Sequence, residues 1–247
     1  MLCCAVYNIK MVLLGVALTQ AILVPFLAIA VLDLVVLKIM LGALQPVLAN
    51  NASARWYFVH AVTNGAICVL VAPDIVALFR APLEGLTADY SADFPLAVSV
   101  ALHLYHCISQ CGQLSAIDWA HHLGGNMLVC ALAFPFRYGP LLSWGILFVC
   151  GLPGGLDYLC LFLVKCEYMA KITEKRINRR LNMWVRLPGI VTFLPLSYVC
   201  WSTGDCHVPG SILVIQSLLN LINGVYFADR VVSNSALAES KVRDKLK

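Results

Sequence analysis

Apolar runs long enough to cross a lipid bilayer divide most of this sequence. Seven runs of about 20 residues can be drawn, at positions 11–32, 56–79, 94–112, 118–137, 141–164, 183–203 and 209–228. A run of about 20 mainly apolar residues is the length that a transmembrane helix needs. The sequence therefore predicts an all-α fold, a polytopic membrane bundle of about seven transmembrane helices.

The composition excludes an ordinary soluble domain. Hydrophobic residues make up 61% of the 247 positions and charged residues 12%, whereas soluble domains are about 45 to 50% apolar. The connections are short, and the sequence contains no repeat or low-complexity tract. We divide the chain into an N-terminal transmembrane helix with its connecting loop (1–54), a main transmembrane domain (55–229) and a basic tail (230–247).

Basic residues collect in the fifth connection and in the tail. They are Lys165, Lys171, Lys175, Arg176, Arg179, Arg180 and Arg186 in the connection, and Arg230, Lys241, Arg243, Lys245 and Lys247 in the tail. Cytosolic loops carry an excess of Lys and Arg, so both segments, and with them the C-terminus, are expected in the cytosol. Seven spans then place the acidic second connection, with Glu84, Asp89 and Asp93, on the opposite side. The basic connection could also hold CoA phosphates or anionic headgroups, although the positive-inside rule alone explains it.

Ionisable groups stand inside these apolar runs, where hydrocarbon should exclude them. Asp118, His121 and His122 are spaced i, i+3, i+4, so they share one face of a helix. Asp157 is the only acid in the next run. A charged carboxylate at membrane depth costs at least about 2.5 kcal/mol, so Asp157 is expected to face other helices or a wet cavity.

Further polar side chains form stripes on three other runs. They are His60 and Asn64; Ser99, His103, His106, Gln110 and Gln113; and Gln216, Asn220 and Asn223. A single intramembrane histidine usually packs through a hydrogen bond. These residues, however, all fall in the predicted cytosolic half, which indicates a hydrophilic pocket that opens to the cytosolic leaflet.

Imidazole beside a carboxylate can activate a hydroxyl, an amine or a water at neutral pH. We therefore predict His121 and His122 as catalytic residues, either of which could act as the base, and Asp157 as the group that orients the base or stabilises charge. The remaining polar residues are predicted to bind substrate: His60, Asn64, His103, His106, Gln110, Asp118, Asn126, Asn220 and Asn223.

A metal site is the rival chemistry. His103 and His106, together with the pair His121 and His122, could bind zinc or iron. Membrane desaturases use three histidine boxes, for which the six histidines here are too few. We predict no metal and no other cofactor. A retinal Schiff base is excluded from the last run, 209–228, because it contains no lysine.

Several motifs follow one another in a fixed order along the chain. They are Arg55-Trp56-Tyr57-Phe58-Val59-His60 with Pro73-Asp74, then Asp118-Trp119-Ala120-His121-His122, then Asp157, then Asn182-Met183-Trp184-Val185-Arg186, and finally Asn223 with Tyr226. This series resembles the TLC-domain family, which includes the ceramide synthases and the translocating-chain-associated membrane proteins. The resemblance covers roughly residues 55–229. It implies transfer of an acyl group from acyl-CoA, with His121 and His122 as the catalytic pair and Asp157 as the downstream acid.

The chain departs from the synthases at two points. Synthases have two aspartates near the position of Asp157, and the histidine pair here is followed by Gly124-Gly125-Asn126. The chain looks more like the smaller TLC-domain proteins, some of which influence membrane phospholipid composition.

The resemblance and the composition together set the expected location and partners. We expect the endoplasmic reticulum or another endomembrane, with membrane lipids and acyl-CoA as partners and no nucleic acid. A homodimer or a larger membrane complex is compatible with the helix-packing glycines Gly151, Gly154 and Gly155. The alternatives are a non-enzymatic lipid-sensing or trafficking protein, and a transporter or structural subunit of a membrane complex.

Overall fold

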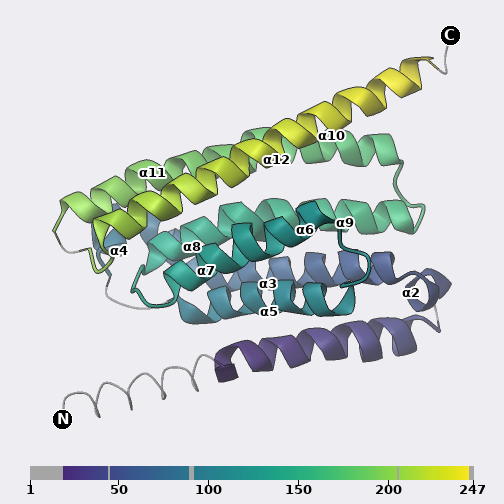
Figure 1. Cartoon of the computed structure of the whole chain (residues 1–247), viewed down its shortest axis with the longest axis horizontal. Helices are drawn as coiled ribbons and strands as arrows, with labels where there is room; N and C mark the ends of the chain where they lie inside the picture. Colours follow the sequence, from purple (N-terminus) through teal and green to yellow (C-terminus); the bar gives the residue numbers. More distant parts are fainter. Residues whose placement is uncertain (1–18, 44, 89–91, 205, 245–247) are drawn as a thin grey trace.

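The computed structural model describes residues 19–43, 45–88, 92–204 and 206–244, and all regular elements among them are helices (Figure 1). Five helices are long and apolar enough to cross a membrane: Thr19–Leu41, Ala52–Arg80, Pro140–Lys165, Lys171–Ser202 and Gly210–Asp244. The predicted all-α bundle is thus confirmed for the described residues. Positions 11–18 of the first predicted run, together with Asp89, Lys245 and Lys247, lie outside them.

The other two predicted spans are helical but shorter. Helix α5 (Asp93–Ser109) has 17 residues. The next run forms one continuous helix from α6 (Ala116–Ala120) through the π-helical segment η2 (His121–Met127) to α7 (Leu128–Ala133). Length and composition therefore identify five spans. Helix α5 is too short to be counted, and the 116–133 helix, which contains Asp118, His121 and His122, is not apolar enough.

The remaining elements follow in chain order. They are η1 (Leu32–Leu41), α2 (Pro46–Asn50), α3 (Ala52–Arg80), α4 (Pro82–Leu86), α8 (Pro140–Ile146), η3 (Leu147–Gly151), α9 (Leu152–Lys165), α10 (Lys171–Leu181), η4 (Asn182–Arg186), α11 (Leu187–Ser202) and α12 (Gly210–Asp244). The segments α8, η3 and α9 form one long helix, as do α10, η4 and α11. Figure 1 shows the N-terminal helix along one edge of the bundle and α12 along the opposite edge.

Local sequence explains where several helices begin. Proline occupies the first turn of α2, α4 and α8, where its missing N–H would be unpaired in any case. Asn51 caps α3 by accepting a hydrogen bond from the Ala54 N–H at 3.1 Å. Ser115 and Asp118 form a capping box at the start of α6.

Glycines bring α9 against α3. A Cβ added at Gly154 would stand 3.0 Å from Asn64 Nδ2, and one at Gly155 would stand 3.3 Å from the Asn64 Cβ. At Gly151 it would meet Cys68 Sγ at 3.3 Å. Small residues of this kind allow close backbone approach between membrane helices. The three predicted packing glycines therefore serve a contact within the chain.

A buried ion pair joins the N-terminal helix to the rest of the bundle. Arg55 Nε donates to Asp33 Oδ1 at 2.9 Å, and the two side chains are 10% and 11% exposed. The Tyr105 hydroxyl donates to Asp33 Oδ2 at 2.7 Å. Arg55 Nη1 also donates to the carbonyls of Leu48 at 2.8 Å and Ala49 at 3.2 Å. A charged pair inside an apolar bundle is tolerable when its hydrogen bonds are made in this way.

The basic connection and the tail are largely helical. Residues 171–181 form α10, which continues into α11, and α12 runs unbroken through the predicted boundary between residues 229 and 230. Arg176 Nε pairs with Glu239 at 3.1 Å, which links α10 to the last turns of α12. Most of the basic residues of the connection and the tail therefore lie on α10 and on α12, whose last turns extend past the bundle at the α10 end (Figure 1).

Candidate functional site

A cavity of about 160 Å³ lies within the bundle, at the end where α10 emerges. It collects side chains from α3, α5, η2, α9, η4 and α12. Eight residues that the sequence singled out line it: His60, Asn64, His103, His121, His122, Asn126, Asp157 and Asn223. The predicted hydrophilic pocket is therefore present, and all three predicted catalytic residues line it.

Five imidazole rings form a connected cluster at this cavity. The ring centroid of His122 lies 4.4 Å from that of His106, 5.4 Å from that of His103 and 5.3 Å from that of His121. The ring of His60 stands 5.6 Å from that of His106. One ring nitrogen of each of His103, His121 and His122 lies within 4.8 Å of the other two, so the three could hold a metal ion.

Several polar atoms at the cavity, or on His106 beside it, are buried and, within the described part of the chain, have no hydrogen-bond partner. They are His60 Nε2, Asn64 Oδ1, His106 Nδ1, His121 Nδ1, His122 Nδ1, Asp157 Oδ1 and Arg186 Nε. An unpaired buried polar group costs about 1 to 3 kcal/mol, and proteins contain few of them. Their concentration at one cavity is typical of a site that a polar ligand completes.

Backbone contacts fix the protonated nitrogen on two of the rings. His103 Nδ1 lies 2.7 Å from the Ser99 carbonyl oxygen, and His60 Nδ1 lies 3.3 Å from the Trp56 carbonyl oxygen. A carbonyl oxygen only accepts, so in each contact Nδ1 must carry the proton. The Nε2 atom of each neutral ring then has a lone pair available for a proton or a metal.

Among the further lining residues, three with hydrogen-bonding side chains were missed by the sequence analysis: Tyr158, Asn178 and Arg186. Arg186 was counted among the loop cations, but η4 continues the α10 helix and carries this residue into the bundle. Its Nη1 donates to Asn182 Oδ1 at 2.7 Å, one helical turn earlier. Extending the helix through residues 171–186 would have shown this i, i+4 pair.

Four predicted binding residues do not line this cavity. The ring of His106 packs against that of His122. Gln110 is the C-cap residue of α5, and Asn220 lines the neighbouring small cavity. Asp118 Oδ2 accepts hydrogen bonds from the Ser115 hydroxyl at 2.7 Å and from the Ser115 N–H at 3.0 Å. The carboxylate of Asp118 thus caps a helix, which explains its place one turn before the histidine pair.

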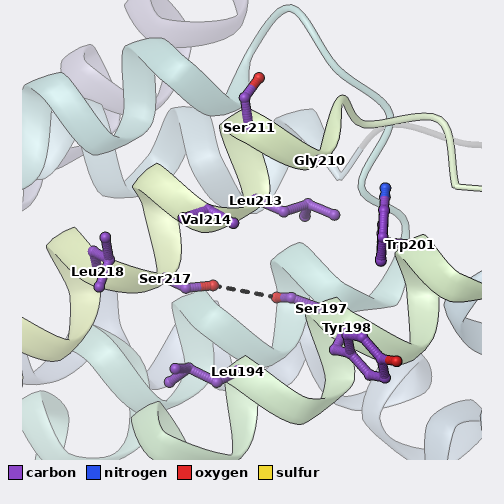
Figure 2. A pocket seen from close by; sticks show the side chains of 10 residues that line it. All are labelled: Leu194, Ser197, Tyr198, Trp201, Gly210, Ser211, Leu213, Val214, Ser217 and Leu218. Atoms are coloured by element: carbon purple, nitrogen blue, oxygen red, sulfur yellow. Dashed lines mark hydrogen bonds between the residues drawn. The ribbon is translucent and has the colours of Figure 1, made fainter.

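Two further cavities have mainly apolar linings. A small cavity of about 40 Å³ shares Gly125, Asn126, Val149 and Cys150 with the polar one and is also lined by Phe193. A separate groove of about 570 Å³ lies between α11 and the first turns of α12. Figure 2 shows Leu194, Tyr198 and Trp201 on one side of the groove and Leu213 and Leu218 on the other.

Other polar groups of the bundle, Gln216 of the last predicted stripe among them, are used for packing. The Ser143 hydroxyl donates to Asp74, the Tyr138 hydroxyl donates to Gln216, and Trp144 Nε1 donates to the Gly189 carbonyl at 2.9 Å. These groups are paired with one another, in contrast to those at the cavity. The difference separates structural polar residues from candidate functional ones.

Comparison with known proteins adds no assignment. No family model matches the chain, and it has no match among curated proteins or among solved structures. The functional inference below therefore depends on the geometry of the cavity and on the motifs in the sequence.

Proposed function

We propose that this chain is a multipass endomembrane protein of the TLC-like type that transfers an acyl group from acyl-CoA to a lipid. The observation that supports this most is the set of unpaired buried atoms at the polar cavity, where imidazole nitrogens and Asp157 Oδ1 line one space. Such a set can accept, hold and return a proton away from bulk water.

The proposed step needs one base and one acid, and a single imidazole supplies both. His121 or His122 takes the proton from a lipid hydroxyl or amine while that oxygen or nitrogen attacks the thioester carbonyl carbon. The carbon–sulfur bond breaks, the CoA thiolate leaves, and the imidazolium returns the proton to the sulfur. Asp157 and Arg186, on the same cavity wall, orient the acceptor and offset developing charge.

The apolar cavities support an acyl substrate. The polar cavity shares four lining residues with the small cavity at Phe193, and a separate apolar groove of about 570 Å³ lies between α11 and α12. This arrangement suits a molecule with a long hydrocarbon tail and a polar reacting end.

The proposed topology has seven spans, a cytosolic C-terminus and a location in the endoplasmic reticulum. Helix α5, with 17 residues, is about 26 Å long at 1.5 Å per residue, and the bilayer of that organelle is about 27 Å thick. A thin membrane therefore suits the two short helices. The basic face of α10 at the cavity end would meet the phosphates of CoA at the cytosolic surface.

The test is conversion of labelled acyl-CoA by purified protein in lipid nanodiscs. The proposal predicts acyl-lipid product with the unmodified chain and a loss of about 100-fold or more in His121→Ala or His122→Ala, the usual size of a general base effect. His207→Ala, at the far surface, is the matched control. Lipid that is bound tightly but never acylated would favour a lipid carrier instead, and flux without covalent change would favour a transporter.

A further inference from the structure

Three histidine side chains from two helices lie close together at the polar cavity. His103 comes from α5, and His121 and His122 open η2. One candidate ligand nitrogen from each residue lies within 4.8 Å of the other two. Such convergence is not needed to pack helices, because each ring could pair with a backbone carbonyl of its own helix, as His103 does.

The hydrogen bond of the His103 ring matches that of a metal ligand. In protein sites, a ligating histidine usually donates its second ring N–H to a carbonyl or carboxylate, which fixes the ring and directs the other nitrogen at the metal. His103 makes this contact, from Nδ1 to the Ser99 carbonyl at 2.7 Å, which leaves Nε2 with the lone pair. His121 and His122 each keep a buried Nδ1 without a partner among the described residues.

We infer that His103, His121 and His122 bind one divalent transition-metal ion of the zinc type, with a coordination position left open towards the cavity. Three histidine ligands and an open fourth position are a common arrangement of catalytic zinc. Nitrogens on a tetrahedral zinc stand about 3.3 Å apart, given zinc–nitrogen distances of about 2.0 Å. The 4.8 Å spread must therefore shrink by about 1.5 Å, which small side-chain rotations can provide.

The surroundings suit a metal that acts on a substrate. Asp157 lines the same cavity and supplies a negative charge, and His60 Nε2 is buried there with its lone pair unused. With a metal in place, the open position would receive a carbonyl or hydroxyl oxygen, and His60 would take over as the proton acceptor. Metal binding itself does not depend on the proposed acyl transfer, since it is measured on the resting protein.

The experiment measures metal on detergent-purified protein that carries no polyhistidine tag. We expect about one equivalent of zinc by elemental analysis. After chelation and addition of Co²⁺, the protein should show the visible absorption of a nitrogen-ligated tetrahedral ion. His103→Gln, His121→Gln and His122→Gln should each weaken Co²⁺ binding about tenfold or more. His207→Gln and the cavity variant His60→Gln should keep it.

If a variant fails to fold, the metal dependence of the unmodified chain still tests the inference. Folded, chelated protein should gain thermal stability when zinc is added back, and no acyl-CoA is present in this measurement. Failure of the unmodified chain to take up either Co²⁺ or zinc would overturn the inference, as would equal uptake by all three folded ligand variants. Acyl transfer is assayed separately, so its absence with metal bound would reject only the proposed function.

Discussion

The ion pair between Asp33 and Arg55 gives the sharpest prediction about how the bundle holds its N-terminal helix. In Asp33→Leu, Arg55 keeps its bonds to the Leu48 and Ala49 carbonyls but loses its only anionic partner among the described residues. The Tyr105 hydroxyl loses its acceptor at the same time. Removing one member of a buried ion pair costs about 3 to 5 kcal/mol.

The expected shift in melting temperature follows from that cost. For a chain of this size, 1 kcal/mol corresponds to about 2 to 4 °C, so Asp33→Leu should melt about 6 °C or more below the unmodified protein. Tyr105→Phe removes one hydrogen bond to a charged acceptor and should cost about 1.5 to 3 kcal/mol. The double variant Asp33→Leu with Arg55→Met should recover part of the loss, because no unpaired charge remains.

The cysteines of the chain supply the assay. Cys107, Cys130 and Cys200 are buried free thiols, so a thiol-reactive fluorogenic dye reports unfolding in detergent. The double-mutant cycle should show a coupling free energy of about 1 kcal/mol or more between Asp33 and Arg55. An Asp33→Leu protein that melts within about 1 °C of the unmodified chain would refute the reasoning, since a buried guanidinium without a counter-charge should lower stability by more than that.

Two further predictions concern helix packing and capping. Gly154→Val should push α9 away from Asn64, whose Nδ2 would lie 3.0 Å from the new Cβ, and should cost about 1 to 3 kcal/mol of stability. Gly65→Ala, whose new Cβ would have no atom within 4 Å, should be neutral or stabilising in the same melting assay. Equal effects at the two glycines would contradict the close approach of α9 to α3. Asn51→Ala should remove the cap of α3 and cost about 0.5 to 2 kcal/mol of stability. Asn51→Asp keeps a capping oxygen and should melt close to the unmodified chain. The same loss of stability in both variants would show that the cap is not the cause.

Periodicity and depth were enough to predict the polar cavity. His60, His103 and His121 lie on different runs, but each was placed near the same end by helix rise and by the positions of Lys and Arg, and the structure brings them together. Polar side chains inside apolar helices avoid lipid, so those of several helices gather in one cavity. The same reasoning grouped Asp118 with the histidines, although its carboxylate serves the capping box of α6.

Other features could not be read from residue patterns. Asp33 falls just after the first predicted run, and its pairing with Arg55 and Tyr105 depends on how three helices meet. Arg186 was assigned to a loop because charge density there suggested a connection, whereas α10 and α11 form one continuous helix. The convergence of three ring nitrogens on one point also needs tertiary geometry, which a spacing within one helix cannot supply.

The central claim is that imidazoles and a carboxylate from separate helices share one polar cavity that opens beside α10. The most direct measurement is thiol labelling of a variant whose 11 native cysteines are replaced. His121→Cys or Asp157→Cys is added to this variant, and the protein is reconstituted in sealed vesicles. Arg180→Cys on α10 and Ser202→Cys at the end of α11 mark the two membrane sides. Both cavity positions should react with a membrane-impermeant thiol reagent from the side that labels Arg180→Cys, and acyl-CoA should slow the reaction. Labelling of neither position, or labelling of one from the side of Ser202→Cys, would contradict the account.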